Sequence, residues 1–279
     1  MTQMRIHRVV ADDGTELAGR VHGSGSPLVW VHGAFETGDT CWAELVPRLS
    51  GRYRCYTFDQ RGRGRSGYSL DQSIDRLVRD AKTFIESVGE PVGVVAESGG
   101  AHVALGAAAS TDSVAAMACI EPALTALQSE EEASRFDGVA ARVAKLADEG
   151  RFEDAVWTFA ELIGNEEELA AIRTSGAVSD LAPQVRVQAA EFMQIRRSGP
   201  QPSDPETLAA IDAPVMLLLG TRTALLPWFS RTVRHVSEHA RDARVVEIEG
   251  AGHFGTALAA EAIAEKLEGF FGQTLGRRV

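Results

Sequence analysis

The chain has 279 residues, of which 44% are hydrophobic and 24% are charged, and its 39 Asp and Glu residues outnumber its 28 Lys and Arg residues. This length can bury a sizeable core in one large domain, with or without an insertion. The formal net charge of −11 argues against a nucleic-acid groove or an anionic membrane surface as a partner.

The cysteines and the N-terminal residues indicate which kinds of site and cellular location to expect. The three cysteines are an odd number without C-x-x-C spacing, which predicts neither a disulfide framework nor a zinc site. The N-terminus has no apolar stretch of the kind found in secretion signals, and no window approaches 18 apolar residues. We therefore expect a cytoplasmic protein with no membrane span, metal or organic cofactor. The oligomeric state is left open, with a homodimer as one option.

The first half of the chain alternates predicted strands with predicted helices. Strands are predicted at 5–10 and 17–21 (a hairpin), 28–31, 54–58, 92–96 and 114–120, and helices over 40–49 and 73–88 and directly after Ser98. The apolar residues of 73–88 recur at spacings of three and four, which is typical of an amphipathic helix. Short continuous apolar runs favour buried parallel strands, so the pattern predicts an α/β parallel sheet with helices on both faces.

The alternation stops between about 124 and 205, where only helical patterns occur. We interpret 124–205 as a helical cap inserted into a core made of 1–123 and 206–279. Acidic runs at 130–132 and 166–168 are interpreted as solvated first turns of helices, where acidic residues are favourable. A Pro-rich stretch at 198–205 is predicted to be the return linker. Strands are then predicted at 214–219 and 244–248, and a final helix over 256–271.

Ser98 lies at a sharp predicted turn between the strand at 92–96 and an Ala-rich helix. Such a turn brings two backbones together, so the residues two before and two after its centre must be small, as Ala96 and Gly100 are. The turn would lift the Ser98 hydroxyl clear of the sheet, beside a helix N-terminus that favours developing negative charge. The stretch is a G-x-S-x-G nucleophile pattern with Ala in the first Gly position.

Four motifs follow four predicted strands in order: His32-Gly33, Asp59-x-Arg-Gly-x-Gly-x-Ser66, Ala96-x-Ser98-x-Gly100 and Gly252-His253. Together they resemble the α/β-hydrolase superfamily over essentially the whole chain. The resemblance implies the α/β-hydrolase fold, which has a mostly parallel eight-stranded sheet, helices on both faces, and a helical cap after the sixth strand. It also implies a Ser–acid–His triad.

His253 is predicted to be the general base that takes the Ser98 proton, because it lies in a Gly-flanked loop after a late strand. The resemblance implies an oxyanion hole formed by the backbone N–H groups of Ala34 and Gly99. Phe35 is the weaker candidate donor, and its ring is predicted to line the substrate pocket.

Other residues of the motifs are assigned structural roles. The resemblance implies that His32 shapes the oxyanion loop instead of transferring protons. Asp59 and Arg61 are expected to tie the loop after the fourth strand together by a charge-assisted contact.

The acid of the triad departs from the family's commonest pattern, because Thr223 occupies that position after the seventh strand. We predict that Glu121 replaces it, since some branches of the superfamily place the acid after the sixth strand. Glu121-Pro122 also resembles a branch of small bacterial hydrolases. The alternative is that Glu121 is a cap-hinge carboxylate paired with an arginine such as Arg222.

A serine nucleophile sets the chain apart from relatives that use Asp or Cys, and it predicts acyl-enzyme chemistry. We expect hydrolysis of a carboxylic ester, lactone or thioester of a small to medium apolar small-molecule substrate. Trp157, Phe159 and Phe192 are candidates for pocket walls contributed by the cap. One alternative is a cofactor-free dioxygenase or lyase that uses His253 and Glu121 as its base pair. The other is a non-catalytic ligand-binding member.

Overall fold

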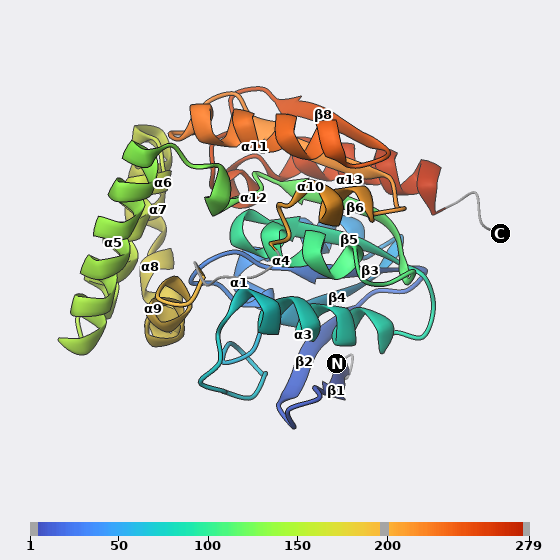
Figure 1. The fold of residues 1–279 in the computed structure, drawn as a ribbon, viewed down its shortest axis with the longest axis horizontal. Helices are drawn as coiled ribbons and strands as arrows, with labels where there is room; N and C mark the ends of the chain where they lie inside the picture. The colour runs from blue at the N-terminus through green and yellow to red at the C-terminus, as the bar shows by residue number, and fades with distance from the viewer. Residues whose placement is uncertain (1–4, 196–200, 276–279) are drawn as a thin grey trace.

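Eight strands form one sheet within residues 5–195 and 201–275, the part of the chain that the computed structural model describes (Figure 1). In the sheet they lie in the order β1-β2-β4-β3-β5-β6-β7-β8. Their bounds are β1 Arg5–Val10, β2 Glu16–His22, β3 Ser26–Val31, β4 Tyr53–Asp59, β5 Val92–Glu97, β6 Val114–Ile120, β7 Val215–Gly220 and β8 Ala243–Ile248. β2 is antiparallel to β1 and β4, and the pairs from β4 to β8 are parallel.

Helices cover both faces of the sheet because its central strands are apolar on both sides. In β5, Val94 belongs to one buried cluster and Val95 to the other, as expected when successive side chains point to opposite faces. The first cluster is covered by α3 (Ile74–Glu86), α4 (Ser98–Ala108) and α11 (Leu226–His239), and the second by α1 (Gly38–Cys41), α2 (Leu45–Leu49) and α13 (Ala260–Thr274). The predicted mostly parallel sheet with helices on both faces is confirmed.

Two predicted helices are each divided in the structure. The stretch 40–49 forms α1 and α2, because Pro47 lacks an N–H and its ring would clash inside a continuous helix. In α2, Pro47 instead lies in the first turn, where it is tolerated. The predicted helix over 256–271 is likewise divided into α12 (Gly255–Leu258) and α13 at Ala259, whose backbone is not helical.

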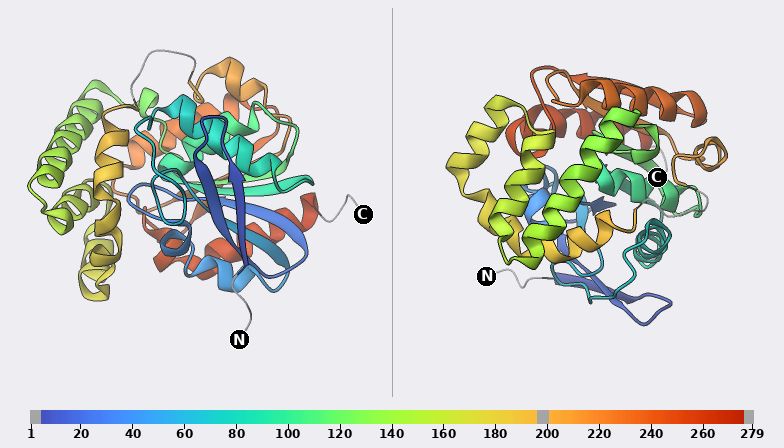
Figure 2. Two further views of the ribbon diagram at one scale, coloured as in Figure 1. Left: turned by 90° about the horizontal axis from the view of Figure 1, so that it is seen from below. Right: turned by 60° about the vertical axis from the view of Figure 1, so that its left-hand side comes forward.

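The chain between β6 and β7 forms a separate layer of helices, here called the α5–α9 layer. It comprises α5 (Glu130–Asp148), α6 (Phe152–Ile163), α7 (Glu166–Ser175), α8 (Ala177–Leu181) and α9 (Val185–Phe192), with short 3₁₀ turns at η1 (Thr125–Leu127) and η2 (Ala182–Gln184). Figure 1 places this layer at one side of the sheet, and the right-hand view of Figure 2 brings it to the front. It has its own buried cluster, into which Phe35 inserts from the loop after β3.

The return from the α5–α9 layer to the sheet passes through α10 (Pro205–Ala209), which packs against α4 and α11. The predicted linker at 198–205 lies partly outside the described residues, which resume at 201. The predicted boundaries of the cap, 124–205, stay a prediction. Among the described residues, no helix combines the length and apolar character that crossing a membrane requires.

Candidate active site

The turn between β5 and α4 holds Ser98 in a strained conformation at the floor of a cavity. Ser98 has a φ of +53°, which L-residues rarely adopt. Among the described residues, the other non-glycine residues with positive φ are Phe35 and Glu121. Phe35 and Ser98 line one cavity, and Glu121 contacts His253, which also lines it. Backbone strain of this kind clusters at functional sites.

Gly100 allows α4 to press against the end of β3. A Cβ at this position would lie 2.2 Å from the backbone oxygen of His32 and 2.6 Å from that of Val31. A Cβ on the neighbouring Gly99, by contrast, would meet no atom within 4 Å. The small residue that the nucleophile pattern requires two positions after Ser98 therefore has a direct steric cause.

Gly100→Ala is expected to destabilise the protein by about 3 kcal/mol or more, because the added methyl meets two backbone carbonyls that cannot move without shifting β3. Thermal unfolding should show a melting temperature lowered by roughly 5–10 °C. Gly99→Ala is the matched control on the same helix and should melt at or slightly above the wild-type temperature. Equal melting temperatures for the two variants would contradict the steric argument.

Ser98, His253 and Glu121 form a continuous hydrogen-bonded series across the sheet edge. The Ser98 Oγ lies 3.1 Å from His253 Nε2, and His253 Nδ1 lies 3.1 Å from Glu121 Oε2. The other Glu121 oxygen accepts the N–H of Gly220 at 2.7 Å, and all three side chains are buried. Parallel strands present their carboxyl ends at one edge, which explains why residues after β5, β6 and β8 meet here.

The electrostatics of His253 suit a proton acceptor. A carboxylate can only accept, so Nδ1 carries the proton that is shared with Glu121 and Nε2 is left to accept from Ser98. Burial by itself lowers the pKa of His253, but the hydrogen bond and charge of Glu121, together with the charges of Glu97 and Glu168, outweigh burial and raise it. The ring of Phe229 stacks on the imidazole with centroids 5.0 Å apart and limits its rotation.

The hinge alternative for Glu121 does not match the contacts. Arg222 forms its ion pair with Glu167, at 2.7 and 2.9 Å, on the exposed start of α7. Thr223, at the family's commonest acid position, is buried, and its hydroxyl has no hydrogen-bond partner within the described part of the chain.

His32 holds the loop after β3 in place as a neutral imidazole. The N–H of Gln60 donates to His32 Nε2 at 3.1 Å, so His32 Nδ1 carries the proton and donates to the Gly33 carbonyl at 2.9 Å. Burial, and then the charge of Arg63, lower the pKa of His32 to about 3. His32 is therefore neutral at physiological pH and shapes the loop without transferring protons.

Both predicted oxyanion donors lie near the serine, because Gly99 follows Ser98 in the chain and Ala34 follows Gly33, which packs against it. A Cβ on Gly33 would come within 3.3 Å of the Ser98 Cβ, so the loop that carries Ala34 presses against the nucleophile. Ala34 lines the cavity, and its N–H has no acceptor among the described residues. Gly99 lies in the first turn of α4, where backbone N–H groups have no intrahelical partner. Phe35, the weaker candidate, already donates its N–H to Gln188 at 2.8 Å.

A cavity of about 450 Å³ opens beside Ser98 and His253. Phe35 and Phe159 lie in its wall as predicted, whereas Trp157 and Phe192 do not. On α6 the cavity face carries residues 156, 159, 160 and 163, and Trp157 is rotated away from that face, under the guanidinium of Arg173. Phe192 packs behind the wall, 5.9 Å from the ring of Phe35.

Glu36, Cys41 and Glu97 form an acidic group in the cavity wall that the sequence analysis did not identify. Their potential ligand atoms all lie within 4.8 Å of one another, and the Cys41 thiol donates to Glu97 at 3.2 Å. Burial, followed by the charge of Glu36, raises the pKa of Glu97 to about 8, and burial raises the pKa of Glu36. Burial also raises the pKa of the Cys41 thiol. These are the described residues whose geometry could hold a cation.

Glu97→Gln is expected to change how stability depends on pH. The folded protein keeps a proton on Glu97 between the ordinary pKa of 4.5 and the raised value of about 8. The unfolded chain loses that proton, so the wild-type free energy of unfolding falls as pH rises through this window, by at most about 1.4 kcal/mol per pH unit. Gln removes this contribution, and urea unfolding at pH 5 and pH 8 should show a smaller loss. If the pH dependence of stability is unchanged in Glu97→Gln, the raised pKa of Glu97 is contradicted. Glu44→Gln at the cavity rim is the control and should keep the wild-type pH dependence.

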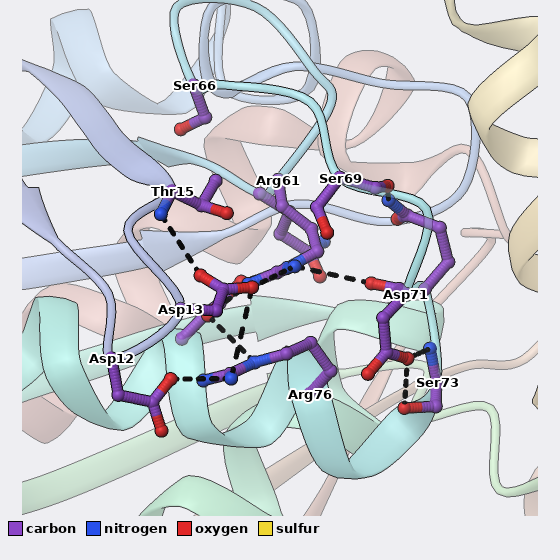
Figure 3. Close-up of polar contacts among 12 residues, drawn as sticks. Asp12, Asp13, Thr15, Arg61, Ser66, Ser69, Asp71, Ser73 and Arg76 are labelled. Atoms are coloured by element: carbon purple, nitrogen blue, oxygen red, sulfur yellow. Dashed lines mark hydrogen bonds and ion pairs between the residues drawn. The ribbon is translucent and has the colours of Figure 1, made fainter.

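The three arginines of the loop after β4 each take a different acidic partner. Arg61 pairs with Asp80 and Asp13, and none of the three lines the cavity; Figure 3 shows Arg61 directed at Asp13. The predicted contact between Asp59 and Arg61 is therefore wrong. Asp59 instead pairs with Arg65 at 3.1 Å. The cause is the pair of glycines with positive φ, at positions 62 and 64, which reverse the chain between the two arginines.

Glu168 corrects a second expectation, because it is buried and not solvated. It accepts the N–H of Asn165 at 3.0 Å in a capping box at the start of α7. Its other oxygen accepts the N–H of Phe254 at 2.7 Å, next to His253. The Asn165-x-x-Glu168 spacing could have predicted the capping box at the start of α7. No local pattern indicated the contact between Glu168 and the loop that carries His253.

Comparisons with known proteins agree with this architecture. Residues 28–266 match the model of the alpha/beta hydrolase family. A non-heme haloperoxidase of Rhodococcus erythropolis is 34% identical over 101 residues, which are 34% of this chain and 36% of that protein. The chain thus aligns with about a third of the length of the curated relatives it matches.

Solved structures extend the similarity to nearly the whole chain. An alpha/beta hydrolase from Sphaerobacter thermophilus is 27% identical with a TM-score of 0.73, covering 95% of this chain and 100% of that one. The esterase RhEst1 from Rhodococcus sp. ECU1013 is 21% identical with a TM-score of 0.78, covering 96% and 99%. At that identity, the second comparison concerns the fold alone.

Proposed function

The chain belongs to the alpha/beta hydrolase family, and we propose that it is a serine hydrolase that cleaves a carboxylic ester, lactone or thioester through an acyl-enzyme. The observation that carries the proposal is the series Ser98–His253–Glu121, with both intervening distances at 3.1 Å and the serine facing a cavity. A nucleophile, a base and a group that orients the base are the minimum set for this chemistry.

In the proposed reaction, the Ser98 Oγ attacks the carbonyl carbon of the ester while its proton passes to His253 Nε2. Negative charge develops on the carbonyl oxygen, where the N–H groups of Ala34 and Gly99 stabilise it. His253 then gives the proton to the departing alkoxide, which leaves as the alcohol. A water molecule, deprotonated by His253, then attacks the acyl-enzyme. As the bond to Ser98 breaks and the carboxylic acid is released, His253 returns that proton to the Ser98 Oγ. Glu121 stabilises the imidazolium that forms in both steps.

The cavity supports a small to medium substrate that is largely apolar and carries no negative charge. Aliphatic and aromatic side chains from the α5–α9 layer form much of its wall, including Val156, Phe159 and Ile163. Glu36 and Glu97 add acidic groups, and no Lys or Arg lines the cavity within the described part of the chain. An anionic substrate would therefore gain no compensating ion pair in the cavity.

Haloperoxidase activity is the second candidate, favoured by the 34% identity to the haloperoxidase of Rhodococcus erythropolis over 101 residues. Bromination of an activated diketone in the presence of bromide and hydrogen peroxide would measure it.

The dioxygenase or lyase alternative would use His253 and Glu121 as a base and Ser98 only to bind the substrate. The hydrogen bond of 3.1 Å between Ser98 and His253 Nε2 supplies the proton transfer that a nucleophilic serine needs.

The test of the proposed function is covalent labelling with a fluorophosphonate, followed by intact-mass measurement and mapping of the modified residue. The expected result is one adduct per chain, located on Ser98, whose formation is slowed by a competing neutral ester. A protein that takes no label and hydrolyses no ester, lactone or thioester would refute the proposal. A label on another serine would refute the assignment of the nucleophile.

A further inference from the structure

Gln188 of α9 reaches from the α5–α9 layer to the loop that carries the proposed oxyanion donor Ala34. Its Oε1 accepts the backbone N–H of Phe35 at 2.8 Å and also the Nη2 of Arg63 at 2.8 Å. Gln188 and Arg63 are almost completely buried, at 0% and 1% exposure. Arg63 is anchored in turn by an ion pair with Glu191, one turn further along α9. A buried polar chain thus links the loops after β3 and β4 to α9.

This contact acts on the peptide group next to the proposed oxyanion donor. His32 holds the Gly33 carbonyl, which belongs to the same planar peptide as the Ala34 N–H. Gln188 holds the Phe35 N–H, which belongs to the following peptide. The Ala34 N–H lies between these two fixed points, so both hydrogen bonds determine its direction.

Phe35 needs an external partner because its φ of +61° is unfavourable for a bulky residue. Such a conformation persists only where the surroundings over-determine it. Those surroundings belong to the α5–α9 layer: Gln188 accepts the Phe35 N–H, and the ring packs 5.2 Å from Phe159 and 5.9 Å from Phe192. At its other end, the loop is held by the sheet, through Gly38 N–H and Asp59 at 2.7 Å.

We propose that Gln188 is a positioning residue that orients the oxyanion hole from outside the sheet, and that Arg63 holds Gln188 in place. This inference rests on the proposed function, because it assigns a role in stabilising the oxyanion of that same reaction. The α5–α9 layer is then part of the catalytic machinery as well as a wall of the substrate cavity.

The experiment compares Gln188→Met with Gln188→Glu. Only the oxygen of the Gln188 amide is used, since its Nε2 has no partner among the described residues. Met keeps the length and removes the acceptor, whereas Glu keeps the acceptor and adds a charge that Arg63 can pair. Gln188→Asn, which withdraws the amide by one methylene, is the second variant if Gln188→Met does not fold. Each variant is checked by thermal unfolding.

The readouts are kcat and KM for a neutral ester and Ki for a trifluoromethyl ketone, whose adduct with serine carries an oxyanion. Gln188→Met and Gln188→Asn should lower kcat by about 10- to 100-fold with KM nearly unchanged, and should raise Ki by a similar factor. Gln188→Glu should restore kcat to within about fivefold of wild type.

Three results would overturn the inference: an unchanged kcat in a folded Gln188→Met, a fall in kcat without a rise in Ki, or a Gln188→Glu as impaired as Gln188→Met. In each of these, wild-type hydrolysis leaves the proposed function standing. A wild-type protein that neither hydrolyses esters nor binds the ketone would overturn the proposed function and the inference with it.

Discussion

Ser98→Ala lowers kcat for ester hydrolysis by about 10⁵- to 10⁶-fold, and this is the largest effect that we expect of any substitution in this protein. The substitution removes the atom that attacks the carbonyl, while the oxyanion donors and the cavity stay in place. Alanine also fits the strained position, since only Oγ is lost. The variant should therefore fold, keep its affinity for the ester and retain weak hydrolysis above the rate in water.

The measurement is kcat and KM for a neutral ester, with substrate affinity for the variant determined by equilibrium binding. Ser110→Ala, on the turn directly after the same helix, is the control and should hydrolyse the ester at the wild-type rate. This experiment also separates the proposed mechanism from the dioxygenase or lyase alternative. In that alternative Ser98 only binds a substrate oxygen. Replacing Ser98 by Ala would then raise KM and leave most of kcat unchanged.

Glu121→Gln is expected to lower kcat by about 10³- to 10⁴-fold with little change in KM. Gln has nearly the same shape as Glu, and its amide can still accept the Gly220 N–H. The amide NH₂ would then face His253 Nδ1 and favour the tautomer in which Nε2 carries the proton. That tautomer cannot accept the Ser98 proton, so the base is lost even though the geometry survives.

The pH dependence of Glu121→Gln gives a second readout. Burial lowers the pKa of His253, and the acidic groups around it more than offset burial, with the hydrogen bond and charge of Glu121 as their largest contributions. Activity requires neutral His253, so the acidic limb of the wild-type kcat/KM profile should lie above the ordinary histidine pKa of about 6.5. Removing the Glu121 charge should move that limb to lower pH.

Glu167→Gln is the control for this prediction, because Glu167 is exposed and pairs with Arg222 outside the cavity. It should leave both kcat and the pH profile unchanged. If Glu121→Gln reacts with a fluorophosphonate as fast as wild type, Glu121 does not orient the base. The assignment of Ser98 as the nucleophile would survive that result.

Much of the fold could be predicted from local patterns. The apolar runs of β3 to β7 indicated buried parallel strands because both of their faces are covered, and the structure confirms the mostly parallel sheet. The division of 40–49 could also have been predicted, since Pro47 forbids a continuous helix there. The division of the last helix at Ala259 had no such signal, because alanine is the best helix former.

Only part of the candidate site could be predicted from the sequence. Ser98, Glu121 and His253 each follow a strand, and parallel strands present their carboxyl ends at one edge, so their meeting could be predicted from chain order. The pocket was harder to predict. Trp157 and Phe192 are aromatic residues in the right helices, but whether a helix face meets a cavity depends on how the helix is rotated in its layer.

By itself, the sequence determined the strand order along the chain, the tight turn at Ser98 and the residues that follow each strand, because these depend on neighbours a few positions apart. Only the tertiary structure decided the partners of the charged and polar residues. Gln188 meets Phe35 across 153 positions, Glu168 meets Phe254 across 86, and Cys41 meets Glu97 across 56. Carboxylates and amides accept hydrogen bonds from many donors equally well. Tertiary packing, not the local pattern, therefore selects which donor each of them receives. For Gln188 and Glu168 this is the packing of the α5–α9 layer against the sheet, and for Glu97 it is the packing of α1 on β5.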